Sequence, residues 1–187
     1  MNSLEQFFVG AGFSGKDLEM IIGSFLLKRF HKDDYFIEEG KFSIHLGFIE
    51  TGVFQYYFLT DGEERTTYIA AENSFLASLF SFLNGTPSRE YIRALTDTKV
   101  WMIKKTNLKK LLETIPAFKD FYIGVLEWQI SCIDKSRHDL ITLNAEQRYA
   151  KLLKEEPNLL QNIPLQYLAS ILGVTPRHLS RIRKNFR

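Results

Sequence analysis

The chain has 187 residues, of which 45% are hydrophobic and 25% are charged, a balance typical of a folded globular protein. Its 16 phenylalanines and 8 tyrosines predict an unusually aromatic core. The single cysteine, Cys132, excludes an internal disulfide and a metal site built from several thiolates of one chain. No apolar run approaches the roughly 18 residues of a membrane span, and the first residues lack a signal-peptide pattern. We therefore expect a cytoplasmic protein without a membrane partner.

Charge is distributed unevenly along the sequence. The net charge is +2, but residues 157–187 contain five basic residues and no Asp or Glu, which leaves −3 for residues 1–156. Such asymmetry is typical of a segment that binds the phosphate backbone of nucleic acid, because neutralised phosphates release counterions. A merely solvated basic face is an equally good explanation of the charge alone.

The first two thirds of the chain contain a helical pattern followed by a β-rich stretch. Apolar residues within 14–30 recur at spacings of three and four, which predicts an amphipathic helix with Ser14 as its N-cap. From Asp33 to Ile103, short aromatic and β-branched runs alternate with turn residues at about ten-residue intervals, as in a sandwich, jelly roll or barrel. The clearest hairpin joins residues 53–59 to residues 66–70 through Asp61-Gly62.

Helical patterns return near Thr106 and restart at Pro116, from which we expect a long helix. One apolar stripe runs along it: Phe118, Phe121, Tyr122, Val125, Gln129, Cys132 and Ile133. This stripe predicts either packing on the β domain of the same chain or a dimer seam. Asn144 and Gln147 have the spacing of a capping box, opening a further helix that Pro157 ends.

The segment from Leu165 to Lys184 has the pattern of a helix-turn-helix. Ala169 is small where the second helix must cross closely, and Gly173 accepts the left-handed backbone that ends a helix. Thr175-Pro176 reads as the N-cap and first residue of the second helix. The apolar seam between the helices is expected to consist of Leu168, Leu172, Val174, Leu179 and Ile182.

The second helix of this motif carries side chains suited to reading DNA. Arg177 and Arg181 lie four residues apart and have the planar fork that grips guanine O6 and N7. The other expected contacts, to bases or phosphates, are Thr175, His178, Ser180, Arg183 and Lys184. A two-helix bundle end with solvated arginines is the structural alternative.

Three stretches of the sequence together resemble the CRP/FNR family of transcription regulators. Residues 36–41 and 48–53 are similar to the opening of its cyclic-nucleotide-binding jelly roll, residues 74–79 and 87–94 occupy the place of its phosphate-binding cassette, and residues 163–186 are similar to its DNA-reading unit. The resemblance implies a homodimer formed along a helix at about 117–135, with the recognition helices in successive major grooves of double-stranded DNA. RNA polymerase and a small-molecule effector are further partners that it implies.

The cassette departs from the family pattern at two places. Cyclic-nucleotide binders of the family carry Gly-Glu and Arg-Ser pairs, where this chain has Ala77-Ser78 and Ser88-Arg89. These departures remove a hydroxyl acceptor and the bidentate phosphate partner, so tight binding of cyclic AMP is not expected. The degenerate effector pocket would consist of Phe75, Leu76, Ala77, Ser78, Leu79, Ser88 and Arg89. The sequence also stops at Arg187, where the family usually continues into a wing, which puts phosphate contacts from that element in doubt.

Several other classes of protein share parts of this pattern. A metal-dependent cupin enzyme needs several histidines around one ion, but only His31 and His45 precede residue 135. Residues 174–181 also resemble AraC-type regulators, yet those have two such motifs and the space here holds one. A haem sensor of the same family, acting through a histidine, and a protein-interaction module that does not touch DNA remain as alternatives.

We therefore predict an α+β protein with no enzymatic activity, no cofactor and no metal. Its expected domains are a jelly-roll sensor with N-terminal helices at 1–115, a dimerisation helix at 116–136 and a helix-turn-helix domain at 137–187. The predicted function is that of a sequence-specific, homodimeric DNA-binding transcription regulator, with an unidentified effector or a non-DNA-binding interaction role as the alternatives.

Overall fold

The computed structural model describes residues 1–155, 157, 160 and 163–186. The chain divides into two compact units, each with its own internal packing. The sheet unit comprises Met1–Glu64 and Tyr68–Gly124, and the C-terminal unit comprises Arg65–Thr67 and Val125–Arg187.

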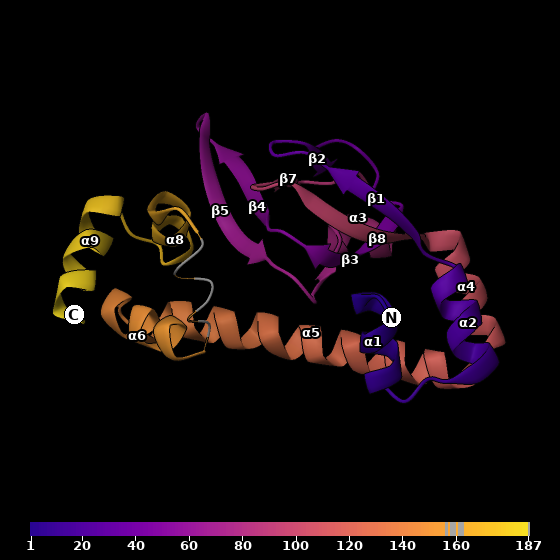
Figure 1. The fold of residues 1–187 in the computed structure, drawn as a ribbon. Coiled ribbons are helices and arrows are strands. Elements are labelled where there is room, and N and C mark those ends of the chain that lie inside the picture. Colours follow the sequence, from indigo (N-terminus) through magenta and orange to yellow (C-terminus); the bar gives the residue numbers. More distant parts are fainter. Residues whose placement is uncertain (156, 158–159, 161–162, 187) are drawn as a thin grey trace. The chain divides into compact units, whose positions relative to one another are not determined.

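The sheet unit is a two-layered β structure flanked by helices (Figure 1). One sheet has the strand order β1-β8-β3-β6 and the other has the order β2-β7-β4-β5. The strands are β1 (Leu26–Phe30), β2 (Tyr35–Ile37), β3 (His45–Thr51), β4 (Phe54–Thr60), β5 (Glu63–Ala70), β6 (Phe75–Leu76), β7 (Tyr91–Ala94) and β8 (Thr98–Lys104). A jelly-roll-like mixture of sheet and helix, the predicted fold class, is thereby confirmed for this part of the chain.

The two sheets enclose one of two hydrophobic cores. Phe30, Ile49 and Val100 come from the first sheet, and they meet Phe54 and Ile92 from the second. All five side chains are at most 3% exposed. Burial of such side chains is the main favourable term that holds the sheets face to face.

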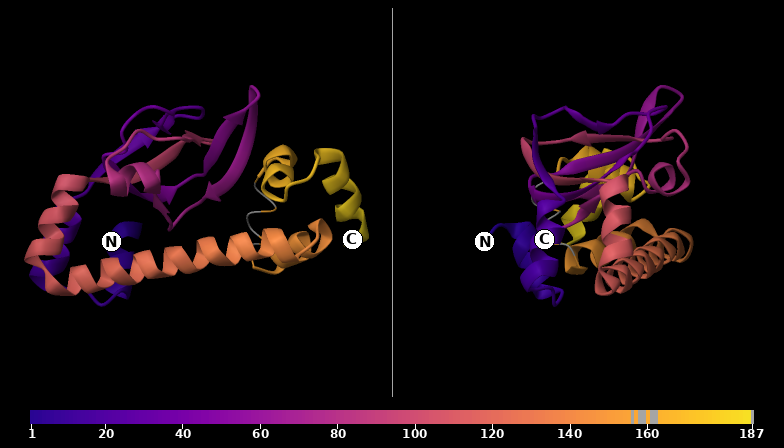
Figure 2. Two further views of the ribbon diagram at one scale, coloured as in Figure 1. Left: turned by 180° about the vertical axis from the view of Figure 1, so that it is seen from behind. Right: turned by 90° about the vertical axis from the view of Figure 1, so that its right-hand side faces the viewer.

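The second core lies between the first sheet and the helices. These helices are α1 (Ser3–Gly10), α2 (Gly15–Gly23), α4 (Lys105–Thr114) and the start of α5 (Pro116–Thr142), while α3 (Leu79–Asn84) supplies Phe82. Phe8 is its aromatic centre, with ring centroids 5.9 Å from Phe13, 6.0 Å from Phe25 and 6.1 Å from Phe118. Many of the aromatic residues therefore lie in this core between the helices and the sheet. Figure 2 shows the ribbons of these helices beside the strands.

The predicted Asp61-Gly62 hairpin is present between β4 and β5. Both turn residues have positive φ, 53° at Asp61 and 80° at Gly62. Two consecutive left-handed residues match the twist of the flanking strands, which explains why this dipeptide was a reliable signal.

The helix predicted over residues 14–30 is wrong in its second half. α2 ends at Gly23, and Leu26–Phe30 forms strand β1, paired with β8 from Leu26–Met102 to Phe30–Thr98. Gly23 and Ser24 weaken the helix, and the pairing of Leu26–Phe30 with β8 outweighs their helical spacing. Ser14 occupies the N-cap position but makes no side-chain capping hydrogen bond. Helix α1 begins after its N-cap Asn2, whose Oδ1 accepts the backbone N–H of Glu5 at 2.8 Å. The range of this helix was not predicted.

The long helix α5 is present and continues to Thr142, beyond the predicted end at 136. The start of the predicted stripe packs on the chain's own sheet unit, because Phe118 is buried and Phe121 and Tyr122 pack against the same core. A different row of apolar side chains is turned to solvent, as described below. Among the described residues, no helix has both the length and the apolarity to cross a membrane.

The C-terminal unit contains α6 (Ala145–Glu155), α8 (Leu165–Ile171) and α9 (Pro176–Asn185). The predicted capping box is confirmed: the backbone N–H of Gln147 donates to Asn144 Oδ1 and that of Asn144 donates to Gln147 Oε1, both at 2.9 Å. The expected end of this helix at Glu156 lies outside the described residues. Buried side chains in this unit include Tyr149, Leu160, Ile163, Leu168, Ala169, Leu172, Leu179 and Ile182.

Gly52 provides a test of the sheet packing. Its φ is +98°, and an added Cβ would lie 2.5 Å from Thr98 Cγ2 and 2.9 Å from the carbonyl oxygen of Asp97. We expect Gly52→Ala to lower the free energy of unfolding by about 1–3 kcal/mol, measured by urea denaturation. Gly10→Ala, which meets nothing within 4 Å, is the control; an equal loss in both variants would contradict the account.

Candidate nucleic-acid interface and effector site

Helices α8 and α9 are joined by a short turn that fixes their crossing. Gly173 has φ +65°, and the N–H of Val174 donates to the carbonyl of Ala169 at 2.9 Å. Leu168, Ala169 and Leu179 are fully buried between the helices. Of the predicted seam residues only Val174 is half-buried rather than buried. The small residue, the glycine and the apolar seam thus occupy the positions that the sequence predicted.

The turn is also held from α6. Arg148 Nη2 donates to the carbonyl oxygen of Leu172 at 2.7 Å, and Nη1 donates to that of Leu143. One guanidinium therefore satisfies a carbonyl at the end of α8 and a carbonyl just before α6. Since the last carbonyls of a helix lack intrahelical partners, this contact stabilises the geometry from which α9 starts. Arg148 was not predicted, because a single arginine on a helix gives no sequence signal of such a role.

The start of α9 is capped as expected. Thr175 Oγ1 accepts the backbone N–H of His178 at 3.2 Å, and Pro176 is the first helical residue. The Ser180 hydroxyl donates to the carbonyl of Pro176 at 2.9 Å. Thr175 retains a hydroxyl proton and Ser180 retains acceptor capacity for an outside partner.

Most basic side chains of α9 are exposed to solvent. Arg177, Arg181 and Lys184 are exposed and Arg183 is half-buried. Within the described part of the chain, none of the four is in an ion pair. Their charges are therefore available to a ligand, in contrast to that of Arg93, which pairs with Glu64 at 2.7 Å.

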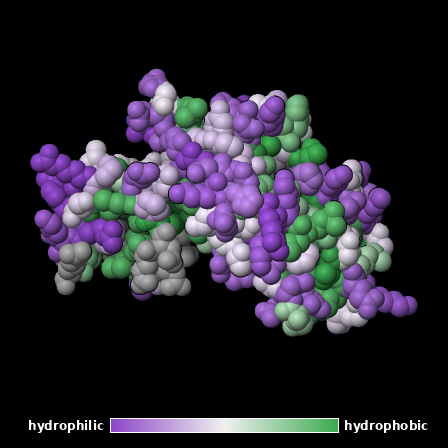
Figure 3. Space-filling model, turned by 45° about the horizontal axis from the view of Figure 1, so that its top comes forward, coloured by the Kyte–Doolittle hydropathy of each residue, from purple (hydrophilic) through white to green (hydrophobic). Residues whose placement is uncertain are grey.

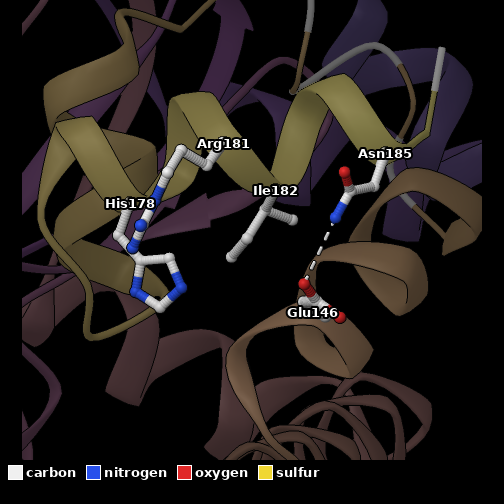
Figure 4. A pocket seen from close by; sticks show the side chains of 5 residues that line it. All are labelled: Glu146, His178, Arg181, Ile182 and Asn185. Atoms are coloured by element: carbon white, nitrogen blue, oxygen red, sulfur yellow. Dashed lines mark hydrogen bonds between the residues drawn. The ribbon is translucent and has the colours of Figure 1, made fainter.

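A cavity of about 350 Å³ lies between α9 and the start of α6. Its lining consists of Glu146, His178, Arg181, Ile182 and Asn185, and Asn185 Nδ2 donates to Glu146 Oε1 at 3.4 Å (Figure 4). In the figure the Arg181 side chain extends along that of His178. His178 is half-buried at this edge, so it is less accessible than Arg177 to a ligand that approaches α9.

The cassette positions in the sheet unit are occupied by hydrogen bonds within the protein. Ser78 and Ser88, 1% and 3% exposed, have their Oγ atoms 3.0 Å apart. The phenol of Tyr56 accepts the N–H of Ala77 at 3.1 Å and lies 3.3 Å from the carbonyl oxygen of the same residue. These groups bond to one another, so they present few free donors or acceptors to a cyclic nucleotide.

The other predicted cassette residues are divided between the cores and the surface. Leu76 is buried between the sheets, and Phe75 packs on Phe48 with ring centroids 5.5 Å apart. Leu79 is half-buried at the start of α3. Arg89 is exposed, and its guanidinium lies 4.9 Å from the ring centroid of Phe80. The structure therefore does not bring Arg89 together with Ser78 and Ser88 in one polar pocket.

Glu90 is a half-buried carboxyl group that the sequence did not single out. Burial raises its pKa above the ordinary value of 4.5, and a hydrogen bond from the Ser78 side chain opposes that rise. It follows Arg89 in a strand-like pattern that gave no reason to expect a carboxyl group bonded to Ser78. Elsewhere in the described residues, His, Cys, Asp and Glu do not gather in groups of three that could hold a metal ion.

Comparisons with known proteins agree with this architecture. Residues 27–115 match the family model of the cyclic nucleotide-binding domain. No match is found among curated protein sequences.

Solved structures with the same fold include several bacterial regulators. A doubly substituted mutant of CooA from Carboxydothermus hydrogenoformans is 17% identical with a TM-score of 0.74, covering 100% of this chain and 84% of its own. The c-di-GMP responsive global regulator CLP from Xanthomonas campestris is 18% identical with a TM-score of 0.69, covering 91% and 90%. A protein from Eubacterium rectale assigned to the crp/fnr family of transcriptional regulators is 16% identical with a TM-score of 0.69, covering 95% and 85%. The predicted resemblance to CRP/FNR regulators is confirmed at the level of fold.

The raised pKa of Glu90 predicts a specific pH dependence of stability. Well below pH 4.5, the ordinary pKa of a glutamate, its carboxyl is protonated in both the folded and the unfolded chain. As the pH rises further, the unfolded chain ionises first, so wild-type protein loses stability that Glu90→Gln retains. We expect the Tm of Glu90→Gln relative to wild type to increase from about pH 4 and then level off once the folded carboxyl ionises, measured by calorimetry. Glu63→Gln, at an exposed position, should show no such trend; a pH-independent difference for Glu90→Gln would contradict the assignment.

Proposed function

We propose that this protein is a homodimeric, sequence-specific DNA-binding transcription regulator of the CRP/FNR type that does not respond to cyclic AMP. The observation that carries the proposal is the α8–turn–α9 segment. Its capped second helix presents exposed arginines with no acidic partner among the described residues. We expect the protein to act in the cytoplasm and to have regulatory rather than enzymatic activity.

The geometry of α9 supports base contacts near its start and phosphate contacts near its end. The opening residues of a recognition helix face base edges in the major groove. Arg177 and Arg181 have the planar fork that binds guanine O6 and N7, so we assign them to bases. Arg183 and Lys184 follow near the C-terminal end, and we assign them to phosphates. Thr175 and Ser180 can add contacts through their remaining donor and acceptor capacity, and His178 can do so only at the edge of the helix.

Helix α5 carries the proposed dimer seam. Ile123, Ile130, Ile133 and Leu140 are 44%, 64%, 52% and 53% exposed. From Ile123 through Leu126 to Ile133 the spacing alternates between three and four residues, as in a coiled coil, and Leu140 follows one heptad after Ile133, with Arg137 at the position between them. Several large apolar side chains in a row are costly to leave in water, which favours pairing with a second copy. This row shares only Ile133 with the stripe predicted from the sequence.

The seam predicts a specific response to charge. A carboxylate at two neighbouring seam positions would have to be buried between the helices, so Ile130→Glu/Ile133→Glu should sediment as a monomer of 21.8 kDa. Ser131→Glu, one residue away on an exposed position, should remain dimeric. Sedimentation equilibrium distinguishes them, and an unchanged mass for the double variant would refute the seam.

The assignments on α9 predict two different losses of DNA binding. Arg177→Ala should cost on the order of 1–3 kcal/mol at one base position and relax specificity there. Arg183→Ala should weaken all sequences similarly and reduce the salt dependence of binding by about one unit of slope. Fluorescence anisotropy with a set of singly substituted duplexes measures both, with Lys110→Ala in α4 as a charge-matched control. Wild-type protein that binds no duplex would favour an interaction module that does not touch DNA.

A further inference from the structure

The sheet unit contains a cavity that is separate from the cassette. Its volume is about 420 Å³, within the range of small-molecule sites. The lining residues are Ser24, Leu26, Lys28, His45, Met102, Lys104 and Asn107. None of these belongs to the predicted effector pocket at 75–79 and 88–89.

Strand register explains why these side chains gather. Met102 is paired with Leu26 of β1 on one side and with Gly47 of β3 on the other, and Lys104 is paired with His45. A Cβ at Gly47 would lie 2.7 Å from Val100 Cγ1, so this face of the strands is the one that carries Val100 into the core between the sheets. The cavity therefore lies at the end of that inner face, beyond the closely packed core.

The cavity has two positive charges and no negative one. Its lining contains Lys28 and Lys104 but no Asp or Glu, and in the described ranges neither lysine is in an ion pair. Lys28 Nζ instead lies 4.5 Å from the ring centroid of Phe30. Burial lowers the pKa of His45, and the charges of Lys104 and Lys28 lower it further. Both lysines therefore lie close enough to His45 to act on its charge.

Apolar surface accompanies these charges. Leu26 lines the cavity while 74% exposed, and Met102 is half-buried beside it. Figure 3 shows hydrophobic surface among hydrophilic surface over the end of the sheet unit that carries α2 and α4. Exposed apolar surface next to unpaired cations is typical of a site for a ligand with both properties.

We propose that this cavity binds a small organic anion with an apolar body. Its carboxylate or phosphate group would lie between Lys28 and Lys104, and its apolar body would contact Leu26 and Met102. Recognition of this kind needs no residue of the cassette and does not depend on DNA binding by α9.

The test uses two aromatic probes that differ chiefly in charge. Both probes have the same phenyl-naphthylamine body. 1-Anilinonaphthalene-8-sulfonate carries a sulfonate on it, and N-phenyl-1-naphthylamine is uncharged. In Lys28→Gln/Lys104→Gln we expect the Kd of the anionic probe to rise at least tenfold and that of the neutral probe to stay the same. Lys99→Gln/Lys110→Gln removes the same charge at exposed positions outside the cavity and should change neither Kd. Fluorescence titration measures each Kd, and thermal unfolding verifies that each variant is folded.

Competition then identifies the head group. Octanoate or octyl phosphate should displace the anionic probe from wild-type protein, and the stronger competitor shows which anion the lysines prefer. Octanol, which lacks the charge, should displace it more weakly than either anion of the same chain length. An anionic-probe Kd that is equal in wild type and in the cavity variant, or that changes equally in the control variant, would overturn the proposal, as would displacement by octanol at the same concentration as by the anions.

Discussion

The packing of the start of α5 into the aromatic core is the constraint on which the rest of the structure depends. Phe118 and Phe121 join Phe8 and Phe13 in a cluster of mostly edge-on and tilted ring contacts beneath the first sheet. Because a helix continues from a fixed start, this cluster determines which face of α5 is buried near its N-terminus and which row of side chains remains free further along. The exposed isoleucines of the proposed seam are a consequence of that choice. The same α5 helix leads towards α6, whose Arg148 holds the turn before α9.

The cassette illustrates how a fold can keep its shape while its binding chemistry changes. Ser78 and Ser88 bond to each other, Tyr56 bonds to the Ala77 backbone, and the exposed Arg89 lies over Phe80. These contacts leave few free donors or acceptors for the phosphate and ribose of a cyclic nucleotide. The cavity lined by Lys28 and Lys104 offers different chemistry at another end of the same sheets. Under the proposed function, an effector would have to bind two dimer geometries with different affinities, since equal affinity shifts no equilibrium.

Sequence reasoning succeeded where a local signal and the tertiary structure agree. Asp61-Gly62, the capping box at Asn144 and the Gly173 turn are short-range devices, and each forms as expected. It failed at residues 26–30, where a spacing compatible with a helix was overridden by pairing with β8, which no local pattern reveals. Among the site residues, exposed arginines on α9 could be predicted from the sequence. The sequence could not predict the contact of Glu90 with Ser78, the contact of Arg148 with Leu172 or the lysines beside His45. These contacts depend on strand register and on groups far apart in the chain.

The central claim is that α9 reads a specific DNA sequence as part of a dimer. Selection of purified protein against a random-sequence duplex library, at about physiological salt, tests it most directly. The account predicts enrichment of a palindrome whose half-sites are about one helical turn apart, roughly 10 base pairs between centres. Enrichment of nothing, both with the protein alone and after addition of cell extract to supply any effector, would contradict it.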